Sequence, residues 1–72
     1  MNAAETARKY EAAKSAMAAY YKENKTKMPP EIGKFREDII QSIVDGLTPE
    51  EAFNRYIQEA IDMTFKQFLS LV

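Results

Sequence analysis

The chain contains no cysteine, no histidine and no tryptophan. Without cysteine it has no disulfide, no thiolate ligand for a metal and no thiol nucleophile. Without histidine it lacks the commonest metal ligand and the side chain that most often serves as a general base near neutral pH. Only carboxylates, lysines and tyrosines remain for chemistry. We therefore expect no bound metal, no cofactor and no enzymatic activity.

Glycine and proline are scarce, with two and three residues respectively among 72. Two isolated glycines do not form a phosphate-binding loop. The chain also lacks an apolar run of the ~18 residues that span a bilayer. Its first residues, MNAAETARK, lack the apolar stretch of a signal peptide. We expect one small domain over residues 1–72, located in the cytoplasm.

Apolar residues recur at helical spacing in three segments, which predicts an all-α, three-helix domain. A long alanine-rich helix is expected from about residue 3 to residue 24, with Asn2 as its N-cap. A second helix is expected over residues 31–45 and a third over residues 49–70. The segment 24–30, which contains two consecutive prolines, is the predicted linker.

The segment Asp45–Glu51 ends the second helix and begins the third within a few residues. Gly46 takes positive φ at little cost, as the end of a helix requires. Thr48 suits the N-cap, Pro49 the first helical position and Glu51 the third, which together predict a capping box. The second and third helices therefore form an αα-hairpin.

Large hydrophobic residues are concentrated in the hairpin. Of the 23 Val, Ile, Leu, Met, Phe and Tyr residues, 17 lie in residues 32–72. The first helix presents mostly alanine on its apolar side. We expect the core to belong to the second and third helices, with the first helix mainly covering it.

Charge is unevenly distributed although the net charge is only −1. Residues 1–36 carry +4 and residues 37–72 carry −5. The first helix can pack on its own acidic hairpin or on a second subunit, or the basic half can bind an acidic or nucleic-acid partner. Candidate contacts with an anion or a nucleic acid lie around the linker; they are Lys22, Lys25, Lys27, Lys34 and Arg36.

Arg36 falls within the apolar face of the second helix on a helical wheel. Two interpretations are open. The guanidinium pairs with a carboxylate or phosphate of a partner, or the side chain lies along the core and extends its head to water.

The C-terminal turns of the third helix are the main candidate contact surface. Phe65 and Leu69 widen the apolar arc there beyond what one neighbouring helix covers, and large exposed apolar patches mark interfaces. Either the first helix covers this arc or a symmetric dimer does; we favour the dimer. The candidate residues of a partner or dimer interface are Met63, Phe65, Phe68, Leu69, Val72, Tyr20 and Tyr21.

The hairpin also suggests a DNA-reading helix-turn-helix, but the first turn of its third helix carries Glu50 and Glu51, where phosphates and base edges would lie. We interpret the turn as structural. The leading hypothesis is a non-enzymatic, homodimeric helical module that binds another protein as an inhibitor, adaptor or regulatory subunit. The alternatives are a nucleic-acid-binding regulator that uses residues 22–36 and a structural subunit of a larger assembly. In size and composition the chain resembles bacterial or phage accessory proteins.

Overall fold

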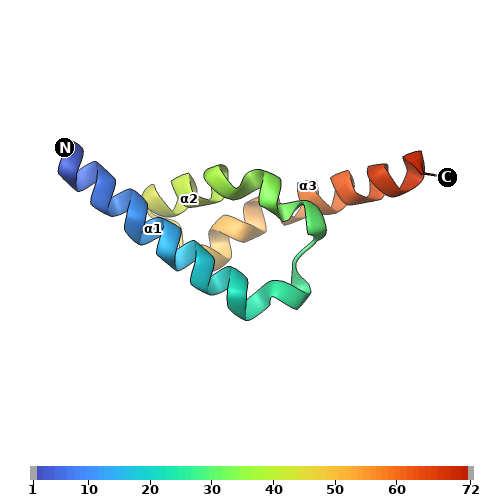
Figure 1. Ribbon diagram of the computed structural model, residues 1–72, viewed down its shortest axis with the longest axis horizontal. Coiled ribbons are helices and arrows are strands. Elements are labelled where there is room, and N and C mark those ends of the chain that lie inside the picture. Colours follow the sequence, from blue (N-terminus) through green and yellow to red (C-terminus); the bar gives the residue numbers. More distant parts are fainter. Residues whose placement is uncertain (1, 72) are drawn as a thin grey trace.

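The computed structural model describes residues 2–71 and shows the predicted all-α, three-helix domain (Figure 1). The first and third helices have the predicted bounds. Two short 3₁₀ helices lie between the first and second α-helices. The elements in chain order are α1 (Ala3–Asn24), η1 (Lys25–Lys27), η2 (Pro30–Phe35), α2 (Arg36–Val44) and α3 (Pro49–Ser70).

The second helix begins differently from the prediction. An α-helix was expected from residue 31, but η2 occupies the first turns and α2 starts only at Arg36. Pro30 has no backbone N–H. The first hydrogen bond of η2 spans three residues, as in a 3₁₀ helix: the Ile32 N–H donates to the Pro29 carbonyl at 3.1 Å. Gly33 is also a poor α-helix former. Local backbone chemistry therefore favours the tighter 3₁₀ winding here.

This winding places two apolar side chains against α3, because residues three apart in a 3₁₀ helix lie on the same side. Ile32 is buried, and the Phe35 ring stacks on Tyr56 of α3 with centroids 5.3 Å apart. As a result α3 packs mainly on η2, whereas α1 packs mainly on α2.

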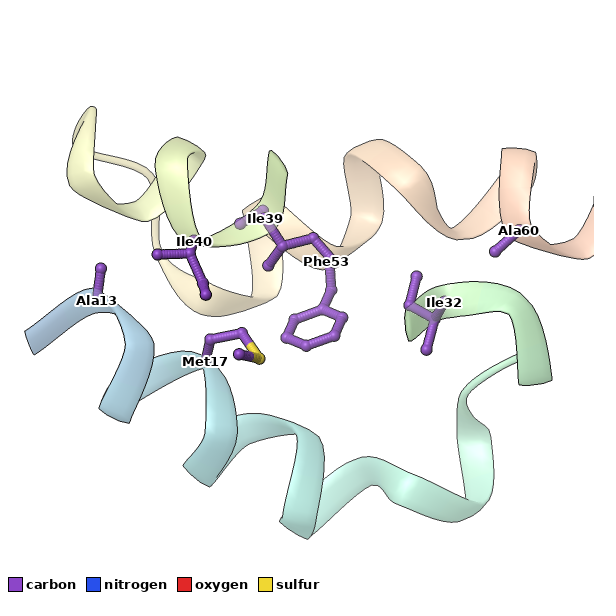
Figure 2. Close-up of a cluster of buried hydrophobic side chains, with 8 residues drawn as sticks. Ala13, Met17, Ile32, Ile39, Ile40, Phe53 and Ala60 are labelled. Carbon is purple, nitrogen blue, oxygen red and sulfur yellow. The ribbon is translucent and has the colours of Figure 1, made fainter. Parts of the chain in front are cut away.

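Phe53 of α3 is the largest fully buried side chain and is 1% exposed. In Figure 2 its ring lies between Met17 of α1 and Ile32 of η2, with Ile39 of α2 beside it. Tyr20 of α1 stacks on the same ring, with centroids 5.2 Å apart and ring planes inclined by 30°. Six of the eight buried hydrophobic residues in the described chain lie in η2, α2 and α3, so the core belongs mainly to the hairpin, as predicted, and α1 adds Ala13 and Met17 to it.

The turn between α2 and α3 has the predicted geometry. Gly46 has a φ of +114°, in the left-handed region where a Cβ is strained. The Leu47 N–H donates to the Ser42 carbonyl at 3.1 Å, and the Gly46 N–H donates to the Ile43 carbonyl at 3.0 Å. These two bonds form a Schellman motif, which satisfies the last carbonyls of α2.

The predicted capping box at the start of α3 is confirmed. The Thr48 backbone N–H donates to the Glu51 carboxylate at 2.9 Å, and the Glu51 N–H donates to the Thr48 hydroxyl oxygen at 3.2 Å. The bond from the Thr48 backbone, followed by that from its side chain, lowers the pKa of Glu51. A hydrogen bond donated to the carboxylate favours its charged form.

The helices extend beyond the core that they share. The molecule measures 50 × 22 × 15 Å, and its radius of gyration is 13.9 Å. A compact chain of this length would have a radius of gyration of about 11 Å. Figure 1 shows why: the start of α1 and the C-terminal half of α3 project at opposite ends. Within residues 2–71, none of the helices combines the length and the apolar character that crossing a membrane requires.

We predict that replacing Tyr20 with Leu lowers the free energy of unfolding by about 1–2 kcal/mol, because the substitution removes an aromatic pair and core volume. Tyr21→Leu is the matched control and should cost less, since its ring lies farther from Phe53, at 6.5 Å, and is 36% exposed. Urea denaturation followed by circular dichroism measures both. Equal losses would contradict the assignment of Tyr20 to the core.

The capping box predicts an acid dependence of stability. Because the folded-state pKa of Glu51 is lowered, its contribution is present above the unfolded pKa of about 4.3 and is lost as the pH falls through the folded value. Glu51→Gln should therefore make the free energy of unfolding less sensitive to pH below about 5. Glu50→Gln, which removes a charge from the same turn without touching the cap, should change that sensitivity less. Urea titrations at several pH values give the free energy of unfolding at each pH. The prediction is wrong if that free energy changes with pH equally in Glu51→Gln and in the unsubstituted chain.

Candidate functional site

The C-terminal half of α3 carries a cluster of exposed large hydrophobic side chains. Their exposed fractions range from 44% at Ile61 to 87% at Leu71. At 100° per residue four of them lie on one side of the helix. We call this set the apolar face; it consists of Ile61, Phe65, Phe68 and Leu69.

The apolar face is uncovered because α3 continues past the core. Ala60 is the last buried residue of α3, and no residue from 61 to 71 is buried. The side of α3 that turns toward the body carries small or half-buried residues, such as Thr64, whose hydroxyl donates to the Ala60 carbonyl at 3.0 Å. The large side chains of the apolar face remain exposed, on the part of α3 that projects from the body of the molecule (Figure 1).

One edge of the apolar face meets the linker. A shallow hollow of about 330 Å³ lies there, lined almost entirely by apolar atoms. Pro29 forms its side on the linker, and α3 forms the other side with Ile61, Thr64, Phe65 and Phe68. A partner on the apolar face would therefore also contact the linker.

The opposite edge of the apolar face carries two opposite charges, Asp62 and Lys66. Asp62 accepts a hydrogen bond from the Gln58 side-chain amide at 3.1 Å. Lys66 forms no ion pair with any residue in the described part of the chain.

Several predicted interface residues lie away from this face. Met63 is half-buried and lies on the opposite side of α3 from Phe65, so it does not belong to the apolar face. Tyr20 stacks on Phe53. Phe53 lies about 12 Å before Ile61 along α3, so Tyr20 does not reach the apolar face. Tyr21 borders the same ring and is partly exposed. Val72 lies outside the described residues.

Ile61 and Leu71 are exposed but were not among the predicted contact residues. Both fall on the stripe of α3 that periodicity assigns to the core. A helical wheel gives the direction of a side chain but not the turn at which the neighbouring elements end. Periodicity therefore does not predict that the other elements stop covering α3 after Ala60.

The predicted basic region is spread over four elements and is partly paired. Lys34 contacts Glu31 at 3.1 Å, and Arg36 Nη1 contacts Glu37 at 2.8 Å. Surface pairs of this kind contribute about 0–1 kcal/mol. The remaining basic residues are exposed and form no ion pair within residues 2–71; they are Lys22, Lys25 and Lys27.

Arg36 extends its head to solvent, with 45% of its side chain exposed. Its neighbour Glu37 links two helices, because the Tyr10 hydroxyl of α1 donates to the second Glu37 oxygen at 2.7 Å. This hydrogen bond raises the pKa of Tyr10, since it is made by the protonated phenol to a negative acceptor.

The described residues contain no group of three or more carboxylates that could hold a metal ion. Two surface features remain: the apolar face of α3 and the positive charges spread around the linker. The first is suited to burial against another protein.

Comparison with known proteins adds no further information on this surface. No protein-family model matches the chain, and no curated protein or solved structure matches it either.

Proposed function

We propose that this protein is a non-enzymatic helical module that binds protein, and that the apolar face of α3 is its contact surface. The observation that supports this is the position of four large apolar side chains on one side of a projecting helix, each at least 44% exposed. Burial of such side chains is the main source of affinity between proteins. We further propose that a second copy of the chain occupies the face, and that the dimer acts in the cytoplasm as an inhibitor, adaptor or regulatory subunit.

The exposed area supports a dimer. The accessible surface is 5253 Å² for a mass of 8.3 kDa. A compact monomer of that mass exposes about 4,600 Å². The excess of roughly 700 Å² is close to the ~800 Å² that each partner buries in a standard interface. Self-association through the projecting end of α3 would bury part of this excess, to which the projecting start of α1 also contributes (Figure 1).

The charges beside the apolar face favour a second copy in antiparallel orientation. Asp62 and Lys66 lie two residues before and two residues after Thr64. In an antiparallel pair of α3 helices with its two-fold axis near Thr64, each Asp62 would lie opposite the Lys66 of the other copy. The Phe65 rings of the two copies would meet close to the axis, where aromatic pairs add to the burial of apolar area. The arrangement would thus be self-complementary in charge.

Leu69→Glu should weaken the dimer by at least roughly 100-fold, because it would bury an unpaired charge in the interface. Sedimentation velocity over a concentration series measures this. The helix content of the monomer should not change, since Leu69 is 54% exposed. Gln67→Glu is the control, because it introduces the same charge on the far side of α3.

A mass that stays at the 8.3 kDa of one chain from micromolar to near-millimolar concentration would overturn the dimer. Loss of helix content in Leu69→Glu would instead assign residue 69 to the core. Unchanged association in that variant would place the interface elsewhere.

The alternative of nucleic-acid binding is tested with the same preparation. Fluorescence anisotropy of labelled single- and double-stranded DNA at low salt should show no binding by this protein. Binding that weakens by roughly 10³-fold or more between 50 and 200 mM salt would support phosphate contacts by the basic region instead. Lys25→Gln and Lys27→Gln would then reduce the salt dependence, whereas Leu69→Glu would not.

A further inference from the structure

A second pocket lies on another part of the molecule, between α1, η2 and α2, and has a volume of about 310 Å³. Its inner wall is the core itself, formed by Met17, Ile32, Ile39 and Phe53, all of which are buried. Figure 2 shows these four side chains converging from four different elements. Pockets that hold small molecules start at about 300 Å³ and are lined mainly by apolar groups.

Two small residues leave this space open. Ala18 of α1 and Gly33 of η2 both line the pocket and are exposed. A Cβ placed on Gly33 would meet no atom within 4 Å, so the main chain is not crowded there. We expect a larger side chain at either position to occupy part of the pocket.

The polar side chains of the pocket are mainly cationic. Lys14 and Arg36 line it, and none of its lining residues is acidic. The Arg36 guanidinium donates to the neighbouring Glu37 through Nη1 at 2.8 Å and also interacts with the Tyr10 hydroxyl. Lys14 forms no ion pair within residues 2–71. Lys14, without an ion pair in the described residues, and Arg36, paired with Glu37, thus stand beside an apolar wall.

We propose that this pocket binds a small organic anion in which an apolar group, of about the size of a phenyl ring with a short chain, is joined to a carboxylate. The apolar group would lie over this wall against its exposed lining residues, Ala18, Tyr21 and Gly33, and the carboxylate would accept from Lys14 and from the remaining donors of Arg36. The proposal is independent of the dimer, because none of the pocket residues belongs to the apolar face. We favour a small molecule over a protein segment because the pocket is a local hollow that accommodates one group.

The test uses the full chain and a matched pair of probes, 4-phenylbutyrate and its neutral amide, in an NMR titration of backbone amides at low salt. The acid should shift the signals of Ala18 and Gly33 and saturate with a dissociation constant on the order of 1 mM. The amide should bind about fivefold more weakly, because it lacks the charge that Lys14 and Arg36 recognise.

Ala18→Leu should abolish the titration by filling the pocket, whereas Ala19→Leu, on an exposed position beside it, should not. Should Ala18→Leu lose helix content, Gly33→Leu tests the same point from η2. Lys14→Gln and Arg36→Gln should each reduce the preference for the acid over the amide, while Lys25→Gln should leave it unchanged.

Equal binding of acid and amide would overturn the proposal, as would shifts that appear at Phe65 and Phe68 instead of the pocket. Absence of any titration up to the solubility limit of the acid would do the same. Binding of an acetylated Phe-Glu peptide amide without binding of 4-phenylbutyrate would show that the pocket takes a protein segment, and the small-anion proposal would be wrong.

Discussion

The burial of Phe53 is the contact on which the rest of this structure depends. Side chains of α1, η2 and α2 converge on its ring from three sides (Figure 2). In a chain of 72 residues the core is small, so a single aromatic ring is a large share of the buried apolar area. Met17 and Tyr20 bring α1 onto this ring, which explains why an alanine-rich helix is held in place although most of its surface offers little to bury.

The position of Phe53 also explains why the molecule is elongated. It lies in the second turn of α3, and Ala60 is the last buried residue of that helix. The capping box and the absence of glycine and proline after Pro49 keep α3 helical well beyond this point. The result is a rigid extension whose large side chains have no partner within the chain. Local stability of the helix and the limited size of the core together create the apolar face.

The two candidate surfaces differ in their physical origin. The apolar face exists because α3 is longer than the core, and its burial needs a large partner surface. The pocket beside α1 exists because Ala18 and Gly33 are small while the residues around them are large, and it accommodates one group of modest size. Its cations and the unpaired lysines of the linker belong to the basic half of the chain. The apolar face, in contrast, belongs to the acidic half.

Much of the fold follows from local features that the sequence carries openly. Asn2, the prolines, Gly46 and Thr48 act within a few residues of themselves, so the ends of α1 and α3 and the hairpin turn were predictable. Periodicity also identified the widened apolar arc around Phe65 and Leu69. The 3₁₀ winding of η2 was missed, although the two prolines and Gly33 are its local causes.

Other features depend on distances between segments that periodicity does not contain. Tyr20 and Tyr21 are adjacent and chemically identical, yet one ring is occupied by Phe53 and the other is partly exposed. For the same reason Ile61, which periodicity assigns to the core, is 44% exposed, and Met63, a predicted contact residue, is half-buried. The sequence specifies the direction in which each side chain leaves its helix, because that depends on 100° steps along one backbone. Which of those directions meets another element depends on where the helices cross, and this is set only when the side chains of all elements pack together.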